Sequence, residues 1–282
     1  MEKTANNEPS TSDLPNPLAS ALARRHPVFG FWHVLRDMAA TEALQGVAAD
    51  FVIMDMQHWT VTFEDVARAI VTLRQSQLAV VVRVAENNPS LIGKALDVGA
   101  DGVIVPMINT PDDAMAAVAA ALYPPAGTRS WGPRRMPRFK NANDYRRDAN
   151  GNAVVIVQIE TAEAVNAAAD IADVPGLGAM AIGPTDLAIS LGYSDDLMNP
   201  EVGAAARRVR GACESRGVPF GYLARSRAEA GQWLAEGAAL VACESDVAFI
   251  ADGSRVLVET LESARKTALD RAKEDGEKHD SP

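Results

Sequence analysis

The alternation of strand and helix is clearest in residues 153–187, which read AVVIVQIETAEAVNAAADIADVPGLGAMAIGPTDL. Two short apolar runs, Ala153–Ile159 and Gly178–Ile182, predict buried strands. An alanine-rich stretch with helical periodicity, Ala162–Ile171, separates them. A carboxylate follows each run, Glu160 after the first and Asp186 after the second. In a parallel sheet both acids then lie at C-terminal strand ends, on the same face.

The same alternation continues on both sides of this stretch. Apolar runs that predict strands are Val28–Val34, Phe51–Met54, Ala79–Val84, Gly102–Val105, Ala153–Ile159, Gly178–Ile182, Val218–Leu223 and Ala239–Cys243. Helical periodicity follows them in Met38–Val47, Phe63–Gln75, Ser90–Val98, Pro111–Leu122, Ala162–Ile171, Val202–Arg216, Ser226–Glu236 and Asp246–Arg271. Strict alternation predicts an α/β protein with a parallel sheet, here a single (β/α)8 TIM barrel. The alternative is an open doubly wound sheet, but no GxGxxG motif follows the first strand.

Composition sets the broad class of the protein. The chain has 282 residues, of which 48% are hydrophobic and 23% charged, as in globular proteins. Its net charge of −10 disfavours a nucleic-acid partner. Two cysteines without a CxxC motif indicate neither a disulfide framework nor a cysteine zinc site. No apolar run reaches the roughly 18 residues of a membrane span, and the polar N-terminus lacks a signal-like core, so we expect a cytoplasmic protein without a membrane partner.

Three segments stand apart from the regular pattern. Residues 1–16 and 272–282 are polar and rich in proline or charge, which predicts mobile tails around a barrel domain at residues 17–271. Residues 123–152 form the longest insertion and carry seven Arg or Lys residues in an acidic protein. Loops of this length are usually functional, so the insertion could reach over the barrel mouth or contact another subunit.

Glu160 and Asp186 are the first candidates for chemistry. Magnesium and manganese prefer oxygen ligands and keep several waters, so two carboxylates at one sheet edge can form a divalent-metal site. The alternative is that each acid only caps the helix that follows it. The turn Gly183-Pro184-Thr185-Asp186 presents backbone N–H groups at a helix N-terminus and so predicts an anion site, although it could be a plain strand-to-helix turn.

Three further residues are candidates for catalysis. His58 follows the second predicted strand, where its ordinary pKa suits proton transfer; otherwise it is a polar loop residue. Arg83 lies inside an apolar strand, so it needs a partner, either a substrate oxygen or Asp55 or Asp101. Asp97 lies near a helix end, where the helix dipole disfavours an anion, and could pair with His58 or be a solvated surface acid.

Seven segments in one order resemble the HpcH/HpaI aldolase family of metal-dependent class II pyruvate aldolases. The resemblance covers about residues 28–265. It is carried by DFVIMD up to His58, VRV at 82–84, ALDVGADG at 95–102, VPM at 105–107, YPPAGTRS at 123–130, VQIE at 157–160 and IGPTDL at 182–187.

The resemblance implies a (β/α)8 barrel of the phosphoenolpyruvate/pyruvate type, in a homo-oligomer, trimer or hexamer, with the last helix swapped between neighbours. It implies that Glu160 and Asp186 bind Mg2+, Mn2+ or Co2+. Arg83 would stabilise a pyruvate enolate, and His58 paired with Asp97 would be the acid/base. Gln158 would lie beside metal and substrate, and the turn of Gly183, Pro184, Thr185 and Asp186 would bind the pyruvate carboxylate.

The expected reaction is the reversible cleavage of a 4-hydroxy-2-oxo acid to pyruvate and an aldehyde. His58 would take the 4-hydroxyl proton, directly or through a water, and the C3–C4 bond would break. Two alternatives are a CoA-thioester lyase of the citrate lyase type and an oxaloacetate decarboxylase resembling macrophomate synthase. The chain departs from the family at Gln57 and Trp59, where many members have glutamate and a small residue, which leaves the aldehyde open.

Overall fold

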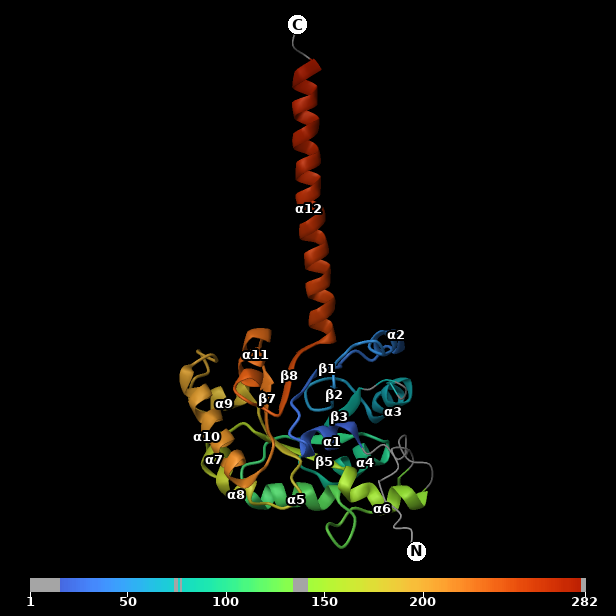
Figure 1. Ribbon diagram of the computed structural model, residues 1–282, viewed down its shortest axis with the longest axis vertical. Helices are drawn as coiled ribbons and strands as arrows, with labels where there is room; N and C mark the ends of the chain where they lie inside the picture. The colour runs from blue at the N-terminus through green and yellow to red at the C-terminus, as the bar shows by residue number, and fades with distance from the viewer. Residues whose placement is uncertain (1–15, 74–75, 77, 134–141, 280–282) are drawn as a thin grey trace, which may run out of the picture.

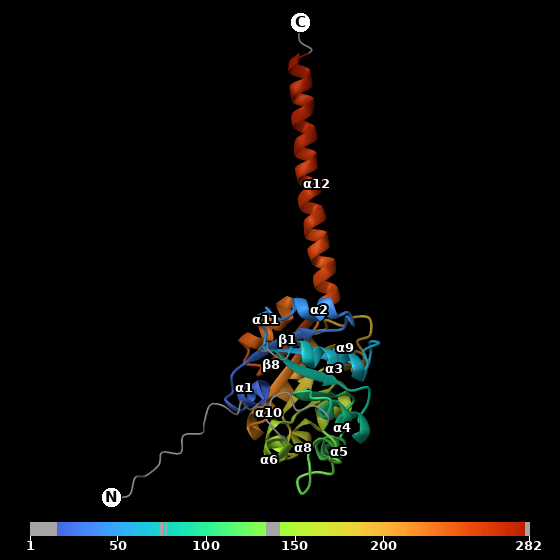
Figure 2. The same cartoon turned by 90° about the vertical axis from the view of Figure 1, so that its right-hand side faces the viewer.

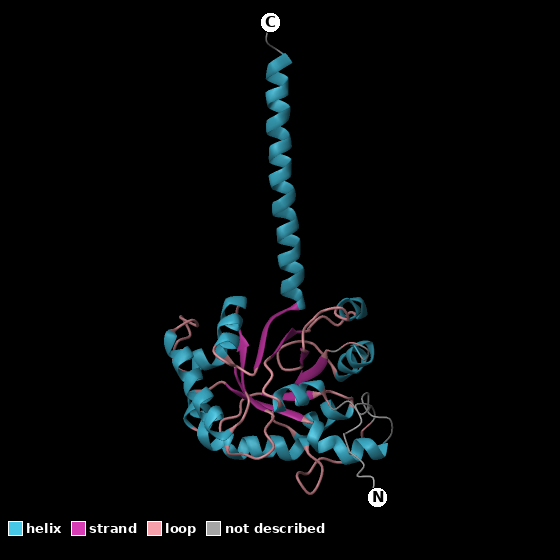
Figure 3. Cartoon of the chain, in the orientation of Figure 1, coloured by secondary structure: helices cyan, strands magenta, loops and turns pink. Residues whose placement is uncertain are grey.

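The computed structural model describes residues 16–73, 76, 78–133 and 142–279, and it contains a closed barrel of eight parallel strands (Figures 1 and 3). Neighbouring strands pair in chain order from first to last, and the last pairs with the first. The predicted (β/α)8 TIM barrel is therefore confirmed. The strands are β1 Val28–Trp32, β2 Phe51–Asp55, β3 Ala79–Arg83, β4 Gly102–Val105, β5 Val154–Ile159, β6 Ala179–Ile182, β7 Phe220–Ala224 and β8 Leu240–Ser245.

Strands β2 to β7 are buried along their whole length, because helices cover the outside of the barrel and side chains fill its inside. The larger core lies between strands and helices and contains residues such as Val52, Val80 and Val157. A second core lies inside the barrel, where Phe51 and Ile156 pack with Leu18 and Leu22 of the first helix. The alternation of side chains along each strand thus divides the apolar residues between two cores.

Twelve helices appear among the described residues. Two of them, α3 and α5, begin with capping boxes, in which Thr62 pairs with Asp65 and Thr110 with Asp113. The helices are α1 Pro17–Ala23, α2 Met38–Ala43, α3 Phe63–Thr72, α4 Pro89–Asp97, α5 Pro111–Ala121, α6 Ala142–Asn152, α7 Ala162–Asn166, α8 Ala168–Ala172, α9 Pro184–Ser190, α10 Pro200–Arg216, α11 Arg227–Ala235 and α12 Asp246–His279.

The last helix, α12, leaves the end of β8 and stands away from the barrel in both views (Figures 1 and 2). It is 34 residues long and exposes large apolar side chains, among them Ile250, Leu257 and Leu261. Residues 272–279, which the sequence places in a C-terminal tail, continue this helix. Over the described residues, no helix is both long and apolar enough to span a bilayer.

The N-terminal residues 1–15 of the other predicted tail lie outside the described part of the chain. Asn16, which the sequence analysis included in that tail, is instead the buried N-cap of α1. Its side chain donates to the carbonyl oxygens of Asp101 and Asn152, so α1 is tied across the end of the barrel where the strands begin. Within the long insertion, residues 142–152 form α6, a helix that the sequence pattern did not predict.

Candidate active site

The two carboxylates predicted as metal ligands lie on adjacent strands at the C-terminal end of the barrel. Glu160 directly follows β5, and Asp186 lies in the first turn of α9, which follows β6. Strands β5 and β6 are paired up to Ile159 and Ile182, so both strands end at the same level. The sheet register therefore brings two acids that are distant in sequence to one side of the barrel mouth.

Glu160 is a buried carboxyl group whose two oxygens both accept hydrogen bonds. Oε1 accepts from the backbone N–H of Met107 at 2.7 Å, and Oε2 accepts from the Gln158 side-chain amide. Burial raises the pKa of Glu160 to about 7, and the negative charge of Asp186 adds to that rise. The two hydrogen bonds and the positive charge of Arg83 oppose it. A cation beside Glu160 would favour its charged form.

The donor set fits a divalent cation that keeps water ligands. Two carboxylates are the number that Mg2+ usually takes from a protein, with waters and substrate oxygens completing its shell. Within the described part of the chain, the Gln158 Oε1 oxygen is buried without a hydrogen-bond partner and is a further acceptor at this place. Among the described residues, no group of three or more His, Cys, Asp or Glu side chains could hold a metal.

Gly183 leaves room for these groups because it has no side chain. A Cβ atom at this position would lie 2.5 Å from Gln158 Nε2 and 2.7 Å from Glu160 Oε2, both too close for real contacts. Gly183 is also the N-cap of α9, whose first turn receives no hydrogen bond from a capping side chain. The N–H groups of Thr185 and Asp186 follow Pro184 in that turn, as the sequence predicted, and they belong to the positive N-terminal end of the helix dipole.

Arg83 ends β3 and is held by two neighbours. Its Nε donates to Asp55 Oδ1 at 2.9 Å and its Nη2 to Asp55 Oδ2 at 2.6 Å, which makes a buried two-pronged ion pair. The guanidinium carbon lies 4.3 Å from the centre of the Trp32 ring. Of the two acids proposed as partners, Asp55 is therefore the one used, whereas Asp101 accepts from the backbone N–H of Val80.

His58 lies in the turn that follows β2 and has an exposed side chain. Its backbone N–H and that of Gln57 both donate to Asp55 Oδ1, at 3.4 and 2.9 Å. Asp55 thus connects the turn that carries His58 to Arg83 on the adjacent strand. The neighbouring Trp59 is also exposed, as expected for a residue at the mouth.

Asp97 is not a partner of His58 within this chain. Its carboxylate binds Arg129 Nη2 at 2.6 Å, and the Arg129 side chain is only 2% exposed. Arg129 also donates to Tyr145 Oη and lies over the Tyr123 ring. Because Asp97 is the last residue of α4, it lies where the chain returns to the start of β4, at the opposite end of the barrel from His58. The expected Asp97–His58 contact is thus replaced by an ion pair to the long insertion.

Sequence reasoning missed two contributors to the site. The sequence predicts Trp32 only as part of a strand, whereas in the structure the guanidinium of Arg83 lies over its ring. Met107 has a φ of 54°, which is rare for residues other than glycine, and this conformation accompanies the hydrogen bond from its N–H to Glu160. No feature of the sequence reveals a positive φ at a methionine, whereas an aromatic residue at the end of β1 could have been noted.

Comparison with known proteins shows the family of this chain. The family model for HpcH/HpaI aldolase/citrate lyase matches residues 28–252. The chain belongs to this family. It is 32% identical over 249 residues to 5-keto-4-deoxy-D-glucarate aldolase of Shigella dysenteriae serotype 1, an alignment that covers 88% of this chain and 97% of the relative. It is 33% identical over 255 residues to 4-hydroxy-2-oxo-heptane-1,7-dioate aldolase of Salmonella paratyphi B, covering 90% and 97%.

A solved structure gives the same result. The crystal structure of an HpcH/HpaI aldolase/citrate lyase family protein from Burkholderia cenocepacia J2315 superposes with a TM-score of 0.83 at 34% identity. The match covers 88% of this chain and 99% of that one. Because the curated relatives above are named as aldolases, the predicted enzyme class, a carbon–carbon lyase, is confirmed at the level of the HpcH/HpaI family.

Proposed function

We propose that this HpcH/HpaI family member is a divalent-metal-dependent aldolase that reversibly cleaves a 4-hydroxy-2-oxo acid to pyruvate and an aldehyde. The observation that carries the proposal is the buried Glu160 carboxyl group, which lies beside Asp186 and within electrostatic reach of Arg83. Two acids and one arginine at the C-terminal ends of barrel strands suit a substrate that develops negative charge on oxygen. The names of the aldolase relatives support the same substrate class.

Glu160 and Asp186 would hold the metal, with Gln158 as their neighbour. Mg2+, Mn2+ or Co2+ bound there supplies Lewis-acid stabilisation of the negative charge that develops on the substrate. The N–H groups of Thr185 and Asp186, in the first turn of α9, would bind the carboxylate of a 2-oxo acid. Their position next to the two acids makes the turn and the metal ligands one site.

Arg83 would bind the oxygen on which enolate charge develops. Its Nη2 and Nε donate to Asp55, and the guanidinium stacks on the Trp32 ring, which fixes its plane. Nη1 is therefore the nitrogen that would bind the substrate oxygen. His58, on the exposed turn anchored to Asp55, would accept the 4-hydroxyl proton during cleavage and return it in the reverse reaction. A partner that orients the His58 ring is not supplied by Asp97 of the same chain.

Hydrogen–deuterium exchange at the pyruvate methyl group, followed by NMR, tests this core without knowledge of the aldehyde. We expect exchange with Mg2+ or Mn2+ that stops with chelator and in Glu160→Gln, Asp186→Asn and Arg83→Met variants. We expect His58 to move the methyl proton in this assay, as it moves the hydroxyl proton in cleavage, and the exposed His26 before β1 provides its matched control: of the two histidine variants, His58→Ala should lose exchange and His26→Ala should keep it. Exchange at the wild-type rate in Glu160→Gln with chelator present contradicts the assignment, and CoA thioesters then become the substrates to screen.

We also propose that the chain forms a homo-oligomer through α12. Ile250, Leu257 and Leu261 are each about 60% exposed and recur at intervals of seven and four residues, so they form one apolar stripe along a helix that stands away from the barrel beyond its first turns. A second copy of the chain would cover this stripe, consistent with the trimer or hexamer that the resemblance implies. Sedimentation equilibrium should give a smaller mass for Leu257→Glu plus Leu261→Glu. Ser263→Glu, on the opposite side of the helix, should leave the mass unchanged.

A further inference from the structure

A cavity of about 610 Å3 lies at the end of the barrel where the strands begin, opposite the carboxylates. Its walls come from the segments that lead into β5, β6, β7 and β8, namely residues 150–154, 176–178, 217–220 and 237–239. Helix α1 and the turn after it close the remaining side through Leu22 and Arg25. The volume is that of pockets that hold small organic molecules.

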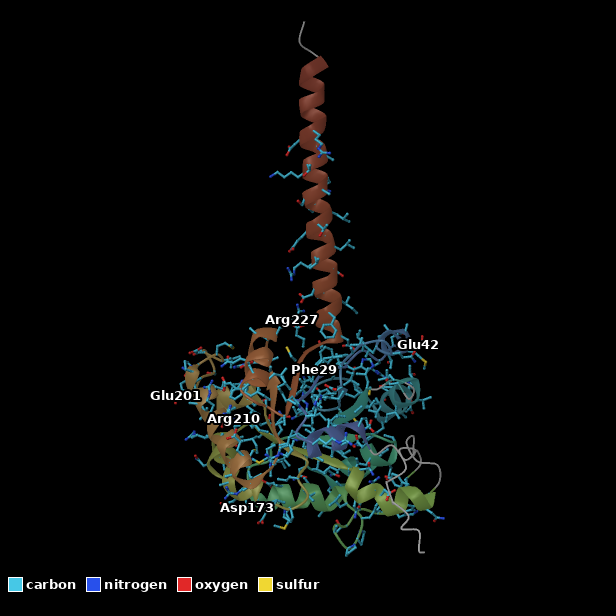
Figure 4. The ribbon with its side chains drawn as sticks, viewed as in Figure 1. Phe29, Glu42, Asp173, Glu201, Arg210 and Arg227 are labelled. Carbon is cyan, nitrogen blue, oxygen red and sulfur yellow. The ribbon has the colours of Figure 1, made fainter. Side chains whose placement is uncertain are left out.

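Two arginines line this cavity, and their environments differ. Arg210 of α10, labelled in Figure 4, is bound to the Glu214 carboxylate at 3.0 Å and to the Glu236 carbonyl oxygen at 2.8 Å. Arg25 makes no side-chain hydrogen bond or ion pair with any part of the chain that the structure describes. The cavity therefore has one positive charge that no acid of the described chain neutralises.

Arg25 is exposed and contributes to the lining of this space from the turn after α1. Its φ of 56° lies in the left-handed region, which is rare for residues other than glycine. The terminal Nη2 lies 3.8 Å from the place where a side chain on Gly217 would begin. Gly217 is the left-handed residue that ends α10 and itself lines the cavity, so the guanidinium lies beside the wall that Gly217 forms.

We propose that this cavity is a second ligand site, which takes a small organic anion with an apolar body. The oxyanion, a carboxylate or a phosphate, would bind Arg25 through charge-assisted hydrogen bonds. The apolar body would lie against Leu22, Pro219 and Phe220. Because the reacting groups of this fold lie at the other end of the strands, the ligand would be an effector and not a substrate.

The cavity has a direct structural connection to the active site. β5 begins at the cavity with Val154 and ends immediately before Glu160. β6 begins just after Gly178, which also lines the cavity, and ends immediately before Gly183. A ligand that immobilises the starts of these two strands therefore acts on the elements that position the proposed metal ligands.

The proposal is tested by measuring the binding of two anions, phenyl phosphate and benzoate, with neutral benzamide as the control. Saturation-transfer NMR and calorimetry measure the binding to the full chain with chelator present. We expect saturable binding of at least one anion and none of benzamide. Arg25→Gln should weaken the binding at least tenfold, and Ala23→Trp, which fills the cavity but keeps the charge, should abolish it. Arg24→Gln, at the exposed neighbouring position outside the lining, and Glu160→Gln should bind as the wild type does.

The outcomes separate this site from the active site and from non-specific charge. No saturable binding of either anion overturns the proposal, as does equal weakening by Arg24→Gln and Arg25→Gln. Loss of binding in Glu160→Gln with retention in Arg25→Gln assigns the anion to the active site and also overturns it. Phenyl phosphate bound in preference to benzoate, or the reverse, supports the site and identifies the oxyanion. All variants must first show the wild-type circular dichroism spectrum.

Discussion

The ion pair between Asp55 and Arg83 allows a quantitative test of how the site is held together. Asp55 is 1% exposed and the Arg83 side chain 10%, so water screens the pair very little. With charge centres roughly 4 Å apart and an effective dielectric constant of about 20, their attraction is about 4 kcal/mol. Replacing Asp55 by leucine leaves the guanidinium buried without its anion, which should lower the free energy of unfolding by about 3–5 kcal/mol.

A double-mutant cycle isolates this energy from other effects of the substitution. The backbone N–H groups of Gln57 and His58 lose their acceptor in every Asp55→Leu variant, so that loss cancels in the cycle. We expect the variant with both Asp55→Leu and Arg83→Met to be more stable than Asp55→Leu alone, because no charge then stays buried without a partner. The coupling energy should be about 3–4 kcal/mol by the same argument.

Urea unfolding followed by circular dichroism measures the four free energies, with chelator present and at one protein concentration, since association would change apparent stability. The exposed pair of Arg216 and Asp173 gives a control cycle, in which solvent screening should leave a much smaller coupling. A coupling of Asp55 and Arg83 below about 1 kcal/mol would refute the reasoning, because the pair would then behave like a surface pair.

Two further predictions concern Glu160 and its surroundings. Gly183→Ala should weaken metal binding, measured by calorimetry, because the new Cβ displaces Gln158 Nε2 or Glu160 Oε2. Gly211→Ala is the control and should leave metal binding unchanged, because a Cβ at that position meets nothing within 4 Å. In the metal-free protein, the pKa of Glu160 is about 7 in the folded state and 4.5 in the unfolded state, so the folded protein binds this proton more tightly. The stabilisation that this proton gives is fully present below pH 4.5 and is lost as the pH rises to about 7. Measured as the difference from Glu160→Gln, the loss should be roughly 3 kcal/mol. A difference that does not change with pH contradicts the raised pKa.

The barrel could be predicted from sequence because its strands and helices have distinct patterns. Apolar β-branched runs such as those of β3 and β5 need both faces buried, and only helices on the outside and side chains on the inside provide that. Helix α6 escaped prediction because ANDYRRDANGN consists largely of poor helix formers. Contacts from elsewhere stabilise it: Asn150 exchanges two hydrogen bonds with the backbone of Tyr123.

The site was predictable where it depends on strand ends and unpredictable where it depends on register. Any parallel barrel brings the residues after β5 and β6 to one mouth, so Glu160 and Asp186 follow from topology alone. The choice of Asp55 over Asp101 for Arg83 depends on the pairing of β2 with β3, in which Asp55 and Arg83 are directly opposite each other. Strands as uniformly apolar as β2 and β3 can pair in several registers with the same burial, and only the closed barrel selects one of them.

Asp97 shows how the direction of an element limits such inference. Its expected partner His58 follows a strand, so it lies at the end of the barrel where strands finish, whereas Asp97 ends a helix and lies where the next strand begins. In a (β/α)8 barrel, a residue that follows a strand and a residue that ends a helix lie at opposite ends of the barrel, whatever their distance in sequence. Arg129 from the insertion meets Asp97 at that opposite end, and its Nε has no acceptor among the residues that the structure describes. The segments of this chain that follow strands are therefore the first places to look for a group that orients the His58 ring.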